Sequence, residues 1–239
     1  MNGIIDIGNT AVKWALFDGT ELLEAGRISY GQWEKLQEIH TKYPSIYWFM
    51  SSVQLEPTEK ELGFSYQVLN LSESLPVTIC YETPSTLGRD RLAAICGAKH
   101  LFPNTACLVI DAGTCITYDL LDSENKYHGG SISPGIQMRL KAMHEFTGKL
   151  PLIDWEDLDG FIGDSTKASM LQGIKQGLLG ESTRQIDLYT EKYPDLRVLI
   201  TGGDSPFFEK NLKKDIFAAP NLVLIGLNTI QNYKQSLNA

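Results

Sequence analysis

The first thirty residues alternate between apolar and polar positions in three short runs. These runs lie at residues 3–7, 12–17 and 22–29. Alternation with a period of two is typical of half-buried strands, and the pairs Gly8-Asn9 and Asp18-Gly19 between the runs are favoured hairpin turns. The pattern therefore predicts two consecutive hairpins at the start of the chain.

Helices and further strands follow. Apolar residues recur at helical spacing in residues 33–40, 90–102, 136–146 and 166–190. Short apolar runs predict strands at residues 46–51, 108–110, 116–121, 131–133, 198–200 and 222–225, and a short amphipathic helix is expected to end the chain. Strands that alternate with helices indicate an α/β fold.

Two segments about a hundred residues apart share one pattern. Residues 4–19 read IIDIGNTAVKWALFDG, and residues 109–123 read VIDAGTCITYDLLDS. Each has an apolar strand, an Asp, a turn with Gly and Thr, a second strand and an acidic turn. One supersecondary unit used twice predicts two similar lobes that face each other across a cleft, residues 1–105 and residues 106–239.

Composition narrows the class of protein. The chain has 239 residues and a formal net charge of −8, which argues against a general binder of nucleic acid or of anionic membranes. It shows no apolar run of bilayer length and no secretory signal pattern. The four cysteines, at positions 80, 96, 107 and 115, have no paired metal spacing and predict buried thiols of a reducing compartment. We therefore expect a cytoplasmic protein.

The first hairpin carries residues suited to phosphate chemistry. A glycine lets the backbone of a tight turn approach a phosphate, so that its N–H groups can bind the oxygens. Gly8, Asn9 and Thr10 supply such a turn, and Lys13 adds an ammonium for the transferring phosphate. Asp6 ends the preceding strand, where a carboxylate can hold Mg²⁺ through water.

Two later segments repeat or complement this chemistry. Asp111 and the turn at residues 113–114 copy the first hairpin, and residues 201–204 (TGGD) let backbone pass close to an adenine or ribose. Each segment alone is more often an ordinary turn. The three together indicate a nucleotide cleft.

Residues 88–91 (GRDR) provide groups for an acceptor substrate. Asp90 can orient a hydroxyl and take its proton, while Arg89 and Arg91 can bind an anionic group. An equally weighted alternative makes Asp90 the N-terminal cap of the helix that follows, with the arginines as surface partners.

Six motifs, in this order, resemble type III pantothenate kinases. They are DIGNTAVK (residues 6–13), GRDR (88–91), DAGT (111–114), GGSISPG (129–135), HEFTGKLPL (144–152) and TGGD (201–204). The resemblance implies the fold of the acetate and sugar kinase, actin and heat-shock ATPase superfamily: two related, ribonuclease H-like α/β lobes, each a mixed sheet flanked by helices, with ATP between them.

The resemblance also implies an activity. The family transfers the γ-phosphate of ATP to the small molecule pantothenate, giving 4′-phosphopantothenate, the first step towards coenzyme A. It works as a homodimer with the pantothenate pocket near the subunit interface, and it needs Mg²⁺ and a monovalent cation, K⁺ or NH₄⁺.

The resemblance assigns a role to each matching residue. The first ATP segment comprises Asp6, Ile7, Gly8, Asn9, Thr10, Ala11, Val12 and Lys13. Further ATP contacts fall to Thr114, Gly202 and Gly203, and Asp111 matches the aspartate that holds the monovalent cation. Asp90 matches the proton acceptor, and the substrate contacts are Tyr81, Gly88, Arg89, Asp90, Arg91 and Thr166.

Two positions depart from the family pattern. Arg89 stands where the family usually has a small residue, so it either points to solvent or tightens anion binding. Asp164 adds a carboxylate near an anionic substrate and is unexplained.

Two rival functions remain open. One is a nucleotide-binding regulatory module that has lost the reaction; the presence of Asp6, Asp90, Asp111 and Lys13 speaks against it. The other is a kinase of the same superfamily that acts on a sugar or a short acid.

Overall fold

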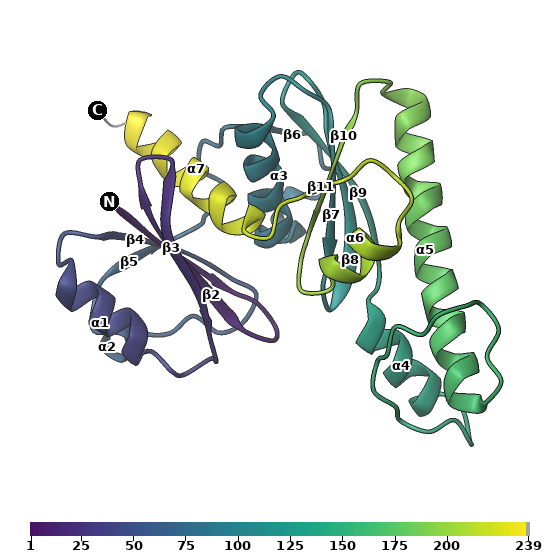
Figure 1. The fold of residues 1–239 in the computed structure, drawn as a ribbon. Coiled ribbons are helices and arrows are strands. Elements are labelled where there is room, and N and C mark those ends of the chain that lie inside the picture. Colours follow the sequence, from purple (N-terminus) through teal and green to yellow (C-terminus); the bar gives the residue numbers. More distant parts are fainter. Residues whose placement is uncertain (238–239) are drawn as a thin grey trace. The chain divides into compact units, whose positions relative to one another are not determined.

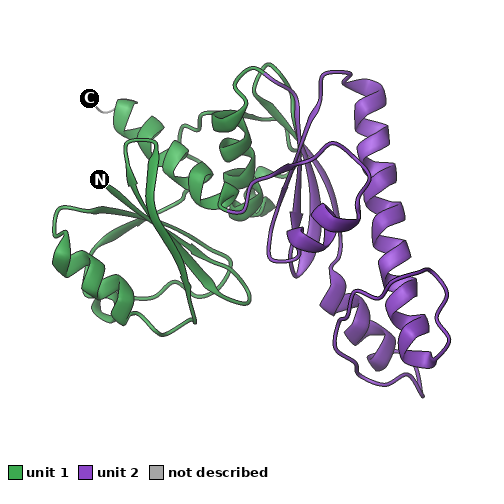
Figure 2. Cartoon of the chain, in the orientation of Figure 1, with its two compact units in different colours: residues 1–104, 121–128, 221–239 green, residues 105–120, 129–220 purple. Residues whose placement is uncertain are grey.

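The computed structural model describes residues 1–237, which fold into two compact units. Among the described residues, unit 1 comprises residues 1–104, 121–128 and 221–237, and unit 2 comprises residues 105–120 and 129–220 (Figure 2). The C-terminal segment therefore packs with the N-terminal unit, although the sequence pattern grouped it with residues 106–239. The division of roles between lobes 1–105 and 106–239 stays a prediction.

Unit 1 is built on a five-stranded mixed sheet (Figure 1). Its order is β3-β2-β1-β4-β5, with β1 (Asn2–Ile7), β2 (Val12–Asp18), β3 (Glu21–Ile28), β4 (Tyr47–Ser52) and β5 (Tyr66–Val68). The pairs β1–β2 and β2–β3 are antiparallel, which confirms both predicted hairpins. Strand β4 runs parallel to β1, and β5 runs parallel to β4.

One face of this sheet packs against α1 (Glu34–Lys42) and α2 (Glu59–Leu62). Alternate strand residues such as Ile5, Ile7 and Trp48 form a core with Leu36 of α1 and Leu62 of α2. Their period of two places Asp6 and Ser51 on the opposite face.

The opposite face is covered by α3 (Arg89–Leu101) and α7 (Leu222–Leu237). The two helices cross where both have a glycine. A Cβ at Gly97 would lie 2.4 Å from Leu222 O, and one at Gly226 would lie 1.6 Å from Ala93 O. Helix α7 thus approaches α3 at backbone distance.

The strand predicted at residues 222–225 is wrong, because these residues begin α7. Leu222, Val223 and Leu224 are all buried, since the sheet lies on one side of the helix and α3 on another. A helix buried all round has a continuous apolar run, which periodicity cannot distinguish from a buried strand.

The remaining part of unit 1 follows β5. Strand β6 (Thr78–Ile79) pairs in parallel with the first residues of β9 (Lys126–Pro134), and the 3₁₀ turn η1 (Pro84–Thr86) leads into α3. Cys80 N donates to Tyr127 O at 2.8 Å, which continues the β6 ladder towards Tyr81.

Unit 2 holds a second sheet with the order β11-β10-β7-β8-β9. Its further strands are β7 (Cys107–Ala112), β8 (Cys115–Leu121), β10 (Arg197–Thr201) and β11 (Phe217–Ala218). Its helices are α4 (Ile136–Glu145), α5 (Thr166–Lys192) and α6 (Ser205–Asn211). Side chains of α4, α5 and α6 form one core with those of β7, β8 and β10.

The cysteines only partly match the expectation of buried thiols. All four are free: Cys96 and Cys107 are buried, whereas Cys115 is half-buried and Cys80 is exposed. Burial raises the pKa of the Cys96 and Cys107 thiols to about 12, so these two stay protonated.

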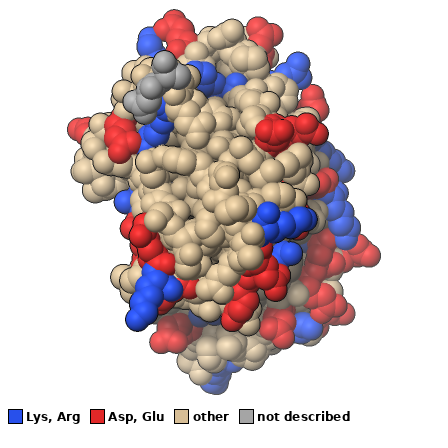
Figure 3. Space-filling model, turned by 90° about the vertical axis from the view of Figure 1, so that its left-hand side faces the viewer, with Lys and Arg blue, Asp and Glu red and all other residues tan. Residues whose placement is uncertain are grey.

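Charges of both signs lie on the face shown in Figure 3. Lys and Arg stand beside Asp and Glu around a central area of other residues. This face therefore presents a mixed field, unlike the basic surfaces that bind nucleic acid. Within residues 1–237, no helix combines the length and hydropathy needed to span a bilayer.

Candidate active site

The first predicted phosphate turn joins β1 to β2. The ladder closes with Ile7 opposite Val12, and Gly8 N donates to Ala11 O at 3.0 Å. Asn9 and Thr10 are exposed at the tip of this turn. The geometry leaves their polar groups accessible to a ligand.

Asp6 lies in a row of polar side chains across three strands. It pairs with Lys13 on β2 and with Ser51 on β4, and all three share one face of the sheet. Asp6 is 7% exposed, and Ser51 is fully buried, with no hydrogen-bond partner for its Oγ among residues 1–237. A carboxylate beside an unused hydroxyl suits a hydrated cation, so these residues fit the expected Mg²⁺.

The segment after β4 contacts the first turn. Gln54 Nε2 donates to Gly8 O at 2.6 Å, and Val53 N donates to Ile7 O at 3.0 Å. Two residues further on, Glu56 Oε1 accepts from Arg89 Nη1 at 2.8 Å. Residues 53–56 therefore link the phosphate turn to the start of α3. The sequence reasoning missed this link, because Gln54 and Glu56 belong to no motif.

Asp90 stands in the first turn of α3, but it is not the N-cap. That position belongs to Gly88, so the capping alternative is wrong in its register. Asp90 Oδ1 accepts from Arg91 N at 2.9 Å, and a Cβ at Gly88 would lie 2.5 Å from the same oxygen. The half-buried carboxylate lies at a helix N-terminus, where the helix dipole favours negative charge.

Arg91 follows Asp90 in the chain and lies against the first of two stacked tyrosines. Arg91 is 7% exposed, and its Cζ lies 5.7 Å from the centroid of the Tyr81 ring. Tyr81 stacks in turn with Tyr127, with ring centroids 6.3 Å apart. The buried guanidinium is thus oriented against an aromatic face, as a residue that binds an anionic group requires.

Unit 2 brings two of its motifs together at one edge of its sheet. Parallel pairing sets Thr201 opposite Asp111, and Asp204 N donates to Ala112 O at 2.9 Å. Gly202 has φ +95°, and a Cβ there would lie 2.6 Å from Asp111 Oδ1. Only glycine fits this position, because a side chain there would overlap both the backbone of Ala112 and the carboxylate of Asp111. The residues after β10 therefore pack directly against Asp111, whose carboxylate oxygens are donors of the kind that the expected monovalent cation would use.

A third motif of unit 2 supports the second phosphate turn. Gly113 N donates to Cys115 O at 3.0 Å within the turn, and Gly135 N donates to Thr114 O at 3.1 Å. A Cβ at Gly135 would lie 2.2 Å from Gly113 O. The end of β9 therefore rests directly on the turn, while the Thr114 side chain stays exposed.

Thr166 is the first residue of α5 and is exposed. Ser165 is the N-cap, because its Oγ accepts from Ala168 N at 3.2 Å. Asp164 is also exposed and precedes the cap. The structure thus places Thr166 at a helix N-terminus but gives no reason for Asp164.

Two further carboxylates of unit 2 have shifted pKa values. Burial raises the pKa of Asp204, which precedes α6 as its N-cap. Burial also acts to raise the pKa of Asp157, but hydrogen bonds from Lys175, Lys210 and Asn211 outweigh it and lower the pKa to about 2. Asp157 anchors the segment before Thr166 to α5 and α6, a role that no motif signals.

Most of the predicted residues thus gather at two places, each within one unit, whereas Thr166 stands at the start of α5. The carboxyl ends of β1 and β4 and the start of α3 hold one set, and the carboxyl ends of β7 and β10 hold the other. Within residues 1–237, no three His, Cys, Asp or Glu side chains lie close enough to form a metal site alone. A cation here would therefore need oxygens from water, backbone or phosphate.

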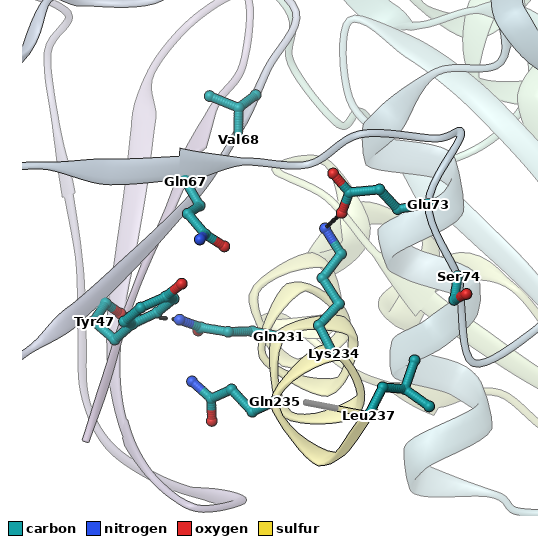
Figure 4. A pocket seen from close by; sticks show the side chains of 9 residues that line it. All are labelled: Tyr47, Gln67, Val68, Glu73, Ser74, Gln231, Lys234, Gln235 and Leu237. Atoms are coloured by element: carbon teal, nitrogen blue, oxygen red, sulfur yellow. Dashed lines mark hydrogen bonds and ion pairs between the residues drawn. The ribbon is translucent and has the colours of Figure 1, made fainter. Parts of the chain in front are cut away.

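A pocket of about 530 Å³ lies elsewhere in unit 1, between β4, β5 and α7 (Figure 4). Lys234 points to Glu73 across it, and Gln231 Nε2 donates to Tyr47 O at 3.1 Å. Its lining residues are Tyr47, Gln67, Val68, Glu73, Ser74, Gln231, Lys234, Gln235 and Leu237. They include none of the residues assigned to the reaction.

Comparison with known proteins decides the family. A family model described as type III pantothenate kinase matches residues 4–187. A type III pantothenate kinase of Bacteroides fragilis (strain YCH46) is 45% identical over 239 residues, which cover 98% of each chain. The chain belongs to the type III pantothenate kinase family.

Two solved structures have a fold similar to that of this chain. A crystal structure from Campylobacter jejuni, described as that of a conserved Baf family transcriptional activator, matches with a TM-score of 0.60 and 21% identity over 99% of this chain and all of that one. The activator of the 2-hydroxyisocaproyl-CoA dehydratase from Clostridium difficile, with bound ADPNP, matches with a TM-score of 0.55 and 13% identity over 99% and 97% of the two chains. The predicted fold class, two α/β lobes of the actin-like kind, is confirmed.

Proposed function

We propose that this chain phosphorylates pantothenate with ATP, giving 4′-phosphopantothenate, the first step of coenzyme A biosynthesis. The observation that carries the proposal is the meeting of three motifs in unit 2. Residues 111–114, 129–135 and 201–204 contact one another through glycines whose Cβ atoms would overlap backbone. Family membership names the reaction, and this assembly supports the nucleotide chemistry.

On the ATP side, the proposal assigns phosphate contacts to Thr10 and Lys13 in the first turn and to Thr114 in the second. Backbone N–H groups of these turns bind phosphate oxygens beside the side chains. Gly202 and Gly203 let the adenosine approach the backbone after β10. Transfer of a phosphoryl group depends mainly on such positioning and charge neutralisation.

On the acceptor side, Asp90 accepts a hydrogen bond from the pantothenate hydroxyl and takes its proton as the oxygen attacks the γ-phosphorus. The bond from the γ-phosphorus to the bridging oxygen breaks, and ADP leaves with that oxygen. The carboxylate is pre-oriented by Arg91 N, which leaves its other oxygen for the substrate. The substrate carboxylate pairs with Arg91, while Tyr81 packs against that guanidinium. Gly88, Arg89 and Thr166 complete the proposed substrate contacts.

Two cations complete the proposal. Asp6 holds Mg²⁺ through water, and Asp111 holds K⁺ or NH₄⁺. When bound, they neutralise the charge of the phosphates. The row Lys13–Asp6–Ser51 and the close packing of Gly202 against Asp111 support these assignments.

A homodimer in the cytoplasm is also part of the proposal. Large apolar side chains are exposed around α4 and the segment before α5, among them Phe146, Phe161 and Ile162. Exposed apolar groups of this size suit a subunit interface. The free thiols suit a reducing compartment.

One assay separates this proposal from its rivals. ADP release is measured with purified protein, ATP and Mg²⁺ in the presence of pantothenate, glucose, N-acetylmannosamine or acetate. Of the four acceptors, we expect only pantothenate to cause ADP release. Mass spectrometry should then show that pantothenate has gained one phosphate. Release with a sugar or acetate would favour the second kinase function, and ATP binding without release would favour the regulatory module.

A further inference from the structure

Arg139 of α4 spans three acceptors with one planar side chain. Its Nε donates to Pro134 O at 2.8 Å, and its Nη2 donates to Ser133 Oγ at 2.9 Å and to Glu181 Oε2 at 2.6 Å. A guanidinium can do this because its donors form a rigid fork, which a lysine lacks.

Glu181 of α5 joins this group to β8. Its Oε2 also accepts from Ser133 Oγ at 3.0 Å, and its Oε1 accepts from Tyr118 OH at 3.0 Å. Tyr118 is fully buried, and its hydroxyl lies 2.8 Å from Ser182 Oγ. Burial raises the pKa of the Tyr118 phenol, so it remains a donor.

The segment at residues 133–135 is therefore held from two sides. On one side are Arg139 and Glu181. On the other, Gly135 N donates to Thr114 O at 3.1 Å, with no room for a Cβ between them. Because the contact is backbone on backbone, a shift of residues 133–135 moves the turn at Thr114 with it.

We infer that Arg139 and Glu181 are positioning residues for the phosphate turn at residues 113–114. The inference rests on the proposed function, in which Thr114 contacts ATP. Neither residue touches the nucleotide; both act through Ser133, Pro134 and Gly135. Loss of the Arg139 guanidinium should then weaken ATP binding and leave the KM for pantothenate nearly unchanged.

The test compares Arg139→Met and Arg139→Lys with the full-length parent protein. ATP affinity is measured by calorimetry, and the KM for each substrate by ADP release. We expect Arg139→Met to weaken ATP binding about tenfold and to change the pantothenate KM by less than about twofold. Arg139→Lys, which keeps the charge but not the fork, should lie between the two. Equal ATP affinity in all three proteins would overturn the inference.

Two controls separate positioning from simple loss of stability. Arg184→Met makes the same substitution at an exposed position of α5, and we expect no effect. Lys175→Met removes a buried ion pair of α5 with Asp157 and lowers stability without touching residues 133–135. If Lys175→Met weakens ATP binding as much as Arg139→Met does, the effect is general and the inference fails. Should Arg139→Met not fold, Tyr118→Phe and Glu181→Gln test the same network.

Failure of the proposed function would look different. Thr114→Val removes the hydroxyl that the proposal places on ATP. If Thr114→Val leaves ATP affinity unchanged, the ATP assignment of this turn fails whatever Arg139 does. If Thr114→Val weakens binding and Arg139→Met does not, only the positioning role of Arg139 fails.

Discussion

Arg89 Nη1 donates to Glu56 Oε1 at 2.8 Å, which ties the first turn of α3 to the segment after β4. The same segment contacts the first phosphate turn through Gln54 and Gly8 O. Arg89, which departs from the family pattern, thus has a partner within its own unit. The ion pair is therefore an alternative to the substrate contact proposed for Arg89.

Removal of either partner of this pair tests that role. If Arg89 acts through Glu56, we expect Arg89→Ala and Glu56→Gln to have similar effects on the pantothenate KM, about threefold or less, because the pair is half-exposed. The double variant should be no worse than either single variant, since both remove the same contact. Steady-state kinetics of the three proteins measure this. A large rise in KM for Arg89→Ala alone would instead place its guanidinium on the substrate.

Asp90→Asn tests the proton acceptor. The amide oxygen can still accept from Arg91 N, so the start of α3 should be preserved while the base is lost. We expect turnover to fall roughly a hundredfold to ten-thousandfold, with ATP affinity unchanged. Glu82→Gln, which neutralises an exposed carboxylate next to Tyr81, is the matched control and should keep normal turnover. Near-normal turnover of Asp90→Asn would remove Asp90 from this role.

Replacement of K⁺ and NH₄⁺ by Na⁺ tests the cation assignment. Turnover of the parent protein should collapse, because Na⁺ prefers a tighter shell of oxygens than K⁺. K⁺ should also raise the Tm of the ATP-bound parent protein but not that of Asp111→Asn. Thermal unfolding in the three salts provides a readout independent of activity. Indifference of the parent protein to the salt would argue against the role of Asp111.

Asp157→Asn should lower stability in a pH-dependent way. The folded-state pKa of about 2 lies below the ordinary aspartate pKa of 3.8, so the stabilisation is fully present above about pH 4 and is lost as the pH falls towards 2. We expect Asp157→Asn to lower the free energy of unfolding by about 2 kcal/mol at pH 7. Its difference from the parent protein should shrink as the pH falls below 4. Urea unfolding across this range measures it. Glu156→Gln breaks an exposed pair with Lys167 and should change stability by less than about 0.5 kcal/mol at every pH.

Gly226→Ala should disrupt the crossing of α3 and α7. The added Cβ would lie 1.6 Å from Ala93 O, so the two helices must separate. We expect the free energy of unfolding to fall by at least about 2 kcal/mol. Gly173→Ala is the contrasting change, because open space surrounds that position on α5. There the better helix propensity of alanine should stabilise the protein by up to about 1 kcal/mol. Equal effects in urea unfolding would contradict the close approach of the two helices.

The local elements and the motifs could be predicted from the amino-acid sequence alone. Period-two alternation with turn residues is a local signal, so both N-terminal hairpins and the strands before Asp6 and Asp111 were predictable. The repeat of that hairpin indicated two related lobes, because the pattern is visible without any long-range contact.

The secondary structure of residues 222–225 and the long-range side-chain contacts are visible only in the folded chain, because they depend on which distant segments meet. Residues 222–225 begin α7, which lies between the sheet and α3. Because a helix buried on several sides lacks the apolar periodicity of an amphipathic helix, the sequence pattern did not identify it. The ion pair of Arg89 with Glu56, and the fork of Arg139 over Ser133 and Glu181, join residues 33 and up to 42 positions apart. No spacing rule couples such positions, so these contacts appear only once the chain has folded.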